Sequence, residues 1–152
     1  MIKQYAENME TGFPGMLYDL SDKTVDSFAV EGEDGIGVGV AVIRGTNSEK
    51  QVKAASTAGD GANVIGVTMH THKELPGEGA YYPGGYAVPV VTKGRVWVQT
   101  GGAVDAGDVA NIKLADGTFV ADAVASGIEA IGCGAKFITS TDAAGIAVIE
   151  IG

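Results

Sequence analysis

Disulfides, long apolar runs and an excess of basic residues are all missing from this chain of 152 residues. Its one cysteine, Cys133, cannot form an internal disulfide, and no cysteine pair offers the spacing of a zinc site. No apolar stretch of about 18 residues occurs and the first ten residues hold no apolar run, so we expect neither a membrane span nor a secretory signal peptide. Ten basic and nineteen acidic side chains give a net charge of −9, which argues against nucleic acid and anionic membranes as partners.

Uninterrupted helix-length windows are also scarce, because 24 glycines are spread through the sequence. Only residues 16–31 and 46–58 are long enough without glycine or proline to hold a helix of ordinary length. Ser21, Asp22 and Thr24 weaken the first window, since their side chains compete for backbone hydrogen bonds. A short helix in residues 16–31 stays open as an alternative to strand and turn.

Short apolar runs separated by turn residues follow from residue 36 onward, which is typical of a sandwich or barrel. We therefore predict an all-β fold, a small β-barrel or β-sandwich of about ten short strands with an extended N-terminal arm. The predicted strands are 36–43, 51–55, 64–70, 86–91, 95–100, 108–114, 118–121, 128–133, 136–139 and 146–151. Lys93-Gly94 and Asp116-Gly117 are each expected to close a hairpin, as Asp60-Gly61, Gly84-Gly85 and Gly101-Gly102 also could. The glycines at 35, 37 and 39 leave one face bare, where another backbone or an aromatic ring can approach closely.

Acidic residues concentrate at the N-terminus, where residues 1–35 hold eight acidic and two basic side chains. We divide the single compact domain into an acidic arm with the first strand, 1–35, and a barrel or sandwich, 36–152. The arm carries apolar anchors at Tyr5, Phe13, Pro14, Met16, Leu17 and Tyr18. It either docks on a partner or covers its own barrel.

Trp97 alternates with Val96 and Val98, so it faces away from them and shares its face with Arg95. Such a tryptophan serves either as a core residue or as a binding hot spot.

Catalytic and metal-binding patterns are weak. His70 and His72 could share an ion on one strand face, with Glu74, Glu78 or Asp60 as further ligands, but the spacing departs from that of cupin-type barrels. Cys133, between two glycines in an apolar run, is expected to behave as a small hydrophobic residue. We predict no catalytic residue, no metal and no cofactor. Tyr81, Tyr82 and Tyr86 form the one aromatic cluster that a carbohydrate-binding module could use.

Several strings in one order carry a family resemblance: GFPGMLYD at 12–19, IGVGVAV at 36–42 followed by RGT at 44–46, IGVT at 65–68, PVVTKGRVWV at 89–98 and AGD at 106–108. With these strings the chain resembles the capsid cement, or decoration, proteins of tailed bacteriophages. The resemblance runs over residues 1–152. The acidic stretch 31–34 and the loop 73–82 depart from the pattern.

The resemblance implies a structural protein without enzymatic activity, made in the host cytoplasm and located in the virion on the outer surface of the capsid. Its implied partners are the major capsid protein, whose neighbouring subunits it would bridge in the expanded lattice, and itself, with a homotrimer favoured over a homodimer. The predicted capsid or oligomer interface comprises Tyr5, Phe13, Pro14, Met16, Leu17, Tyr18, Arg95 and Trp97, and the loop from Lys73 to Tyr82 is a further candidate. The alternatives are a cupin-like metal-dependent enzyme using His70 and His72, and a phage baseplate or carbohydrate-binding β-module.

Overall fold

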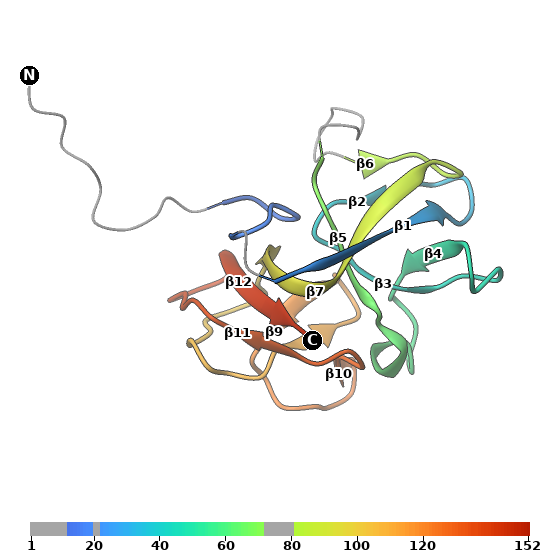
Figure 1. Cartoon of the computed structure of the whole chain (residues 1–152). Helices are drawn as coiled ribbons and strands as arrows, with labels where there is room; N and C mark the ends of the chain where they lie inside the picture. The colour runs from blue at the N-terminus through green and yellow to red at the C-terminus, as the bar shows by residue number, and fades with distance from the viewer. Residues whose placement is uncertain (1–11, 20–21, 72–80) are drawn as a thin grey trace, which may run out of the picture.

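The structure is a computed structural model, and it describes residues 12–19, 22–71 and 81–152. The predicted all-β fold is confirmed (Figure 1). The strands of the described residues are β1 (Thr24–Val30), β2 (Ile36–Gly37), β3 (Ala41–Arg44), β4 (Gln51–Ala54), β5 (Gly66–Thr68), β6 (Tyr81–Tyr82), β7 (Ala87–Gln99), β8 (Asn111–Lys113), β9 (Thr118–Val120), β10 (Ile128–Ala130), β11 (Ala135–Phe137) and β12 (Ile146–Ile151). Tyr5, His72, Glu74, Glu78 and most of the predicted loop 73–82 lie outside the described residues.

Five strands close into a barrel. Strand β1 pairs with β4, β4 with β3, β3 with β5, β5 with β7, and β7 again with β1. The β1–β4 pair is parallel and the other four pairs are antiparallel. A hydrophobic cluster drawn from these strands and from β2 and β6 comprises Phe28, Val30, Ile36, Val42, Val52, Tyr82, Val88 and Val90.

Strand β7 continues beyond this barrel, and its second half supports the C-terminal strands. Residues Gly94 to Gln99 pair with β12, which in turn pairs with β11. Bridges from Val109 to Lys136 and from Thr100 to Phe119 connect the sheet β10-β8-β9 to the same group. Figure 1 shows β7 passing from the N-terminal strands to the C-terminal ones. A second cluster, which includes Val96, Val98, Ile112, Phe119, Phe137 and Ile149, is buried here.

The predicted break between strands 86–91 and 95–100 is wrong, because β7 is one strand of 13 residues. Gly94 lies inside it with φ of +131°, where β1 stops pairing and β12 begins. The β1 register also shifts between Thr24 and Val25. The glycine therefore marks a distortion of a continuous strand, which stays extended because both of its halves have partners, and no hairpin forms at Lys93-Gly94.

The predicted strand 36–43 is also interrupted. Gly39 has φ of +71° and separates β2 from β3, and a Cβ there would lie 2.6 Å from Cβ of Pro14. The buried Thr68 hydroxyl spans the interruption, since it donates to the Gly37 carbonyl (2.7 Å) and accepts from the Val40 N–H (3.0 Å). The expected close approach of another backbone is confirmed at Gly39.

Local turn and helix predictions had mixed outcomes. The helix alternative for 16–31 is wrong for the described residues, which hold an extended segment and β1. Asp60-Gly61 leads into the 3₁₀ helix η1 (Gly61–Asn63) and closes no hairpin. Asp116-Gly117 joins β8 to β9 as predicted, with Gly117 at φ of +73°. In the described part of the chain, no helix has the length and apolar character that crossing a membrane requires.

Replacing Gly94 by alanine should destabilise the fold, because φ of +131° is strained for any residue with a side chain. We expect a loss of about 1–3 kcal/mol in the free energy of unfolding, measured by urea denaturation. Gly102→Ala is the control, since a Cβ at Gly102 meets no atom within 4 Å. Equal stability of the two variants would show that β7 tolerates a side chain at this position.

Candidate interaction surface on the N-terminal arm

Residues 12–19, which belong to the predicted arm, lie beside β7 and are joined to it between Gly15 and Tyr18 by main-chain hydrogen bonds and one isolated β-bridge. The N–H of Gly15 donates to the carbonyl of Trp97 (2.9 Å), and the N–H of Trp97 donates to the carbonyl of Met16 (2.9 Å). The N–H of Tyr18 donates to the carbonyl of Arg95 (3.0 Å), and Leu17 bridges Val96. This arm segment and β12 both pair with the second half of β7.

The arm segment also covers Trp97, which is buried with 7% of its surface exposed. A Cβ on Gly12 would lie 2.5 Å from the indole ring, so the arm backbone rests directly on it. The ring of Tyr18 meets the indole edge-on, with centroids 5.8 Å apart. Val96 and Val98 lie in the second hydrophobic cluster. The structure therefore places Trp97 beneath the arm, on the face of β7 opposite Val96 and Val98.

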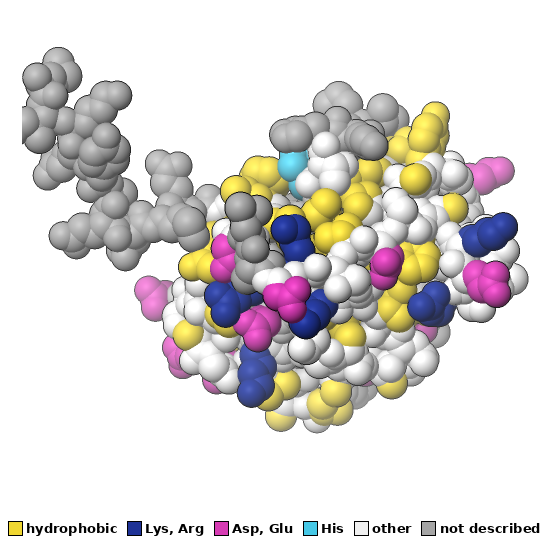
Figure 2. Space-filling model, in the orientation of Figure 1, with side chains coloured by type: hydrophobic (Ala, Val, Ile, Leu, Met, Phe, Trp, Pro, Cys, Tyr) yellow, Lys and Arg dark blue, Asp and Glu magenta, His cyan; other side chains and the backbone are white. Residues whose placement is uncertain are grey.

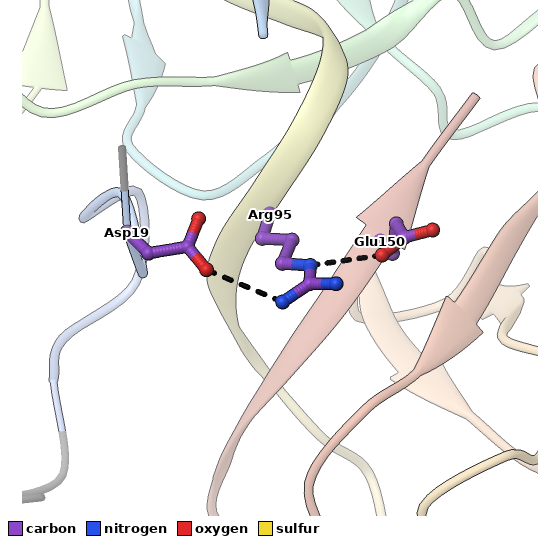
Figure 3. Close-up of polar contacts among 3 residues, drawn as sticks. All are labelled: Asp19, Arg95 and Glu150. Atoms are coloured by element: carbon purple, nitrogen blue, oxygen red, sulfur yellow. Dashed lines mark hydrogen bonds and ion pairs between the residues drawn. The ribbon is translucent and has the colours of Figure 1, made fainter. Parts of the chain in front are cut away.

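Charged side chains connect the arm to β7 and β12 (Figure 3). Arg95 donates from Nε to Glu150 of β12 (2.8 Å) and from Nη1 to Asp19 of the arm (3.2 Å). The hydrogen bond to Glu150 is the main cause of a raised pKa of Arg95. One guanidinium thus joins three elements: the arm, β7 and β12.

A further ion pair joins Lys93 of β7 to Asp22. Lys93 donates to Asp22 (2.9 Å), and this hydrogen bond lowers the pKa of Asp22 below its usual 3.8. The pair is therefore formed at neutral pH and lost only in strong acid, as the pH falls through the lowered pKa. The three ion pairs are at least one-third exposed, so each contributes little to stability.

Two large apolar side chains of the arm remain exposed: Phe13 at 44% and Met16 at 40%. The Phe13 ring meets the His70 ring edge-on at 4.7 Å, and the N–H of His70 donates to the carbonyl of Gly15 (2.8 Å). Pro14 packs against Gly39. On the face in Figure 2, hydrophobic side chains gather beside the histidine, above a mixed group of basic and acidic side chains. We call Phe13, Pro14 and Met16 the arm patch.

Seven of the eight predicted interface residues fall within the described chain, and the structure brings them together on and under the arm. Phe13, Pro14 and Met16 form the patch, Leu17 and Tyr18 pair with β7, and Arg95 and Trp97 lie beneath the arm. Sequence reasoning missed Asp19, Asp22 and Glu150 as ionic partners and Gly12 and Gly15 as contact points, whereas it did predict a close approach at Gly39. Two of these glycines, Gly12 and Gly15, flank Phe13-Pro14 in the string GFPGMLYD, and this spacing could have indicated a close backbone contact.

The metal-site alternative gains no support from the described residues. None of them forms a group of three His, Cys, Asp or Glu side chains that could hold an ion. His70 packs against the arm instead. Burial raises the pKa of the Cys133 thiol, which agrees with its predicted hydrophobic role.

The aromatic cluster predicted for a carbohydrate-binding module is not a set of three exposed rings. Tyr82 is buried at 1%, whereas Tyr81 and Tyr86 are exposed. The Tyr82 hydroxyl donates to the Met69 carbonyl (2.7 Å) and lies 2.9 Å from the Thr71 hydroxyl. Tyr82 is therefore a core residue with its polar end bonded.

The described residues thus form an all-β barrel with an arm that is hydrogen-bonded to β7 and carries two exposed apolar side chains. The whole chain, residues 1–152, matches the family described as structural cement protein (E217 gp24/Pam3 gp6), and it belongs to this family. A structural cement protein of a phage is a virion component located on the capsid.

Comparison with solved structures gives the same fold. The chain is similar to a chain in the structure of the capsid of Myoviridae phage XM1, with a TM-score of 0.69 and 16% sequence identity. The match covers 96% of this chain and 93% of the other. A search of curated protein sequences found no match.

Replacing Gly12 by valine should lift the arm from Trp97, because there is no room for a Cβ against the indole. Trp97 is the only tryptophan, so its fluorescence reports the contact alone, and we expect its emission to shift to the red. Far-ultraviolet circular dichroism should stay unchanged. Gly102→Val serves as the control, and an unshifted spectrum of Gly12→Val would contradict the contact.

Burial of Tyr82 should make stability fall at alkaline pH. Desolvation raises the pKa of Tyr82 above its usual 10.0, against a smaller opposing effect of the bond to Thr71. The unfolded chain therefore ionises first, and stability decreases as the pH rises above 10. Tyr82→Phe should cost about 1 kcal/mol at pH 7 and weaken this decrease, as measured by urea denaturation at several pH values. Tyr86→Phe should do neither, since Tyr86 is exposed.

Proposed function

We propose that this cement protein binds the outer surface of the phage head and stabilises the expanded coat lattice by bridging neighbouring subunits of the major capsid protein. The proposal includes assembly as a homo-oligomer, with a homotrimer favoured over a homodimer. Family membership supports the capsid as the partner. The observation that carries the choice of surface is the arm patch, with Phe13 and Met16 exposed on a backbone that is already hydrogen-bonded in place.

A fixed arm is a favourable way to present apolar side chains. Burying apolar surface stabilises a complex by about 25 cal/mol per Å², and ordering a loop on binding would offset part of this gain. The three main-chain hydrogen bonds between the arm and β7 hold the backbone before any partner arrives. Phe13 and Met16 can then be buried with little loss of backbone freedom.

Stabilisation of the head would follow from mass action. A protein that binds the expanded lattice and not the unexpanded one lowers the free energy of the expanded state. Several weak contacts within one oligomer add through avidity. No chemical step is required, which agrees with a structural role.

The arm patch should be necessary for binding heads. We expect Phe13→Ser with Met16→Ser to lower the affinity for expanded heads at least about tenfold, because the two hydrophobic contacts are lost. The measurement is co-sedimentation of the purified full chain with heads that lack cement protein, together with the melting temperature of the decorated heads. The wild-type chain should sediment at a fixed ratio to the coat protein.

Val109→Ser is the matched control, because Val109 is also exposed, at 57%, and lies outside the arm. Thermal unfolding of the free variants should match the wild type. Full binding by the arm variant would move the attachment surface elsewhere, and a wild-type chain that does not sediment with heads would refute the proposed function.

A further inference from the structure

Two exposed tyrosines lie outside the arm. Tyr86 immediately precedes β7, at the end of that strand opposite the residues that pair with the arm, and Tyr81 lies on β6, where it pairs with Gly37. Tyr86 is 63% exposed, and Tyr81 is 39% exposed beside the buried Tyr82. Figure 1 shows the end of β1 and the start of β7 to the right, away from the arm. In Figure 2, hydrophobic side chains protrude at that end beside an acidic side chain.

The backbone that carries Tyr86 is held from three directions. Its N–H donates to the Pro83 carbonyl (3.1 Å), and its carbonyl accepts from the Val30 N–H (3.0 Å). Gly85, at φ of +80°, donates to the Val30 carbonyl (2.8 Å). A Cβ on Gly84 would lie 2.1 Å from the Gly32 carbonyl oxygen, so this turn and the loop 31–35 touch backbone to backbone. Tyr86 is thus an exposed ring on a fixed turn.

The neighbouring loop 31–35 contributes negative charge. Glu33 and Asp34 are exposed there, and the Cβ position of Gly84 lies 2.7 Å from Cα of Glu33. Glu31 accepts from the Thr46 N–H (2.7 Å), and hydrogen bonds from the side chain and the backbone of Thr46 lower the pKa of Glu31. Neither 31–35 nor 81–87 contains a basic residue. Exposed aromatic rings beside carboxylates suit a guanidinium group, which stacks on a ring and bonds to a carboxylate at the same time.

We propose that Tyr81, Tyr86, Glu33 and Asp34, which we call the barrel tip, form a second docking surface for an arginine-bearing surface of a coat subunit. This inference rests on the proposed function and adds a partner chemistry to it. The arm patch would contact one subunit and the barrel tip the next, so a single chain would bridge two. The charge of the tip and the fixed turn favour this occupant over an apolar one.

The test measures binding of full-length variants to expanded heads that lack cement protein. We expect Tyr86→Ala to lower the affinity at least about fivefold and Tyr86→Phe to keep it, because the ring makes the contact. The double variant Glu33→Gln/Asp34→Asn should also bind more weakly. Its affinity should depend less on salt concentration than that of the wild type, because ionic contacts are screened.

Val124→Ala is the control, since Val124 is 62% exposed on another loop. Unchanged affinity of Tyr86→Ala, with weak binding by the arm variant, would overturn the barrel tip and leave the proposed function standing. A loss with Tyr86→Ala but an unchanged salt dependence of the double variant would overturn the arginine-bearing partner. A wild-type chain that fails to bind heads would instead refute the proposed function itself.

Discussion

Main-chain hydrogen bonding along both edges of β7 is the constraint on which the rest of the structure depends. A buried N–H or carbonyl without a partner costs about 1–3 kcal/mol, so a strand of 13 residues needs partners over its whole length. The first half finds them in β1 and β5, and the second half in β12 and the arm. The two hydrophobic clusters follow from this division, since each half of β7 contributes two valines to one of them.

In the arm, the backbone makes the contacts to β7, and two of the side chains remain exposed and available to a partner. The main-chain bonds to β7 do not depend on side-chain identity, while Phe13 and Met16 point to solvent. Arg95 links the arm to β12, through Asp19 on one side and Glu150 on the other. Exposed ion pairs of this kind stabilise weakly, so the main chain and the cover over Trp97 supply most of the attachment.

Much of the fold could be predicted from local patterns. Alternation placed Arg95 and Trp97 on one face, and Asp116-Gly117 identified the β8–β9 hairpin. Lys93-Gly94 has the same local chemistry, yet β7 runs through it, because its neighbours β1, β5 and β12 come from distant parts of the sequence. A pattern of a few neighbouring residues contains no information about strand partners from distant parts of the sequence.

The candidate surface shows the same limit. The apolar residues of the arm could be identified in the sequence. The ion pairs of Arg95 could not, because Asp19 and Glu150 are 76 and 55 positions away from it. The sequence alone did not distinguish which of the three tyrosines is buried. Tyr81 and Tyr82 both pair with β2, but successive residues of β6 face opposite sides, so Tyr82 is buried and Tyr81 is exposed, while Tyr86 lies outside any strand.

The arm also occupies an edge of β7 that would otherwise be open. A protease cut after residue 19 would release the segment that pairs with Arg95 and Trp97, and it would open one edge of β7 and uncover an indole ring together. Open strand edges template pairing with other chains. Cleaved molecules would therefore tend to aggregate. An N-terminal truncation that fails to bind heads could then have lost either its binding surface or its solubility.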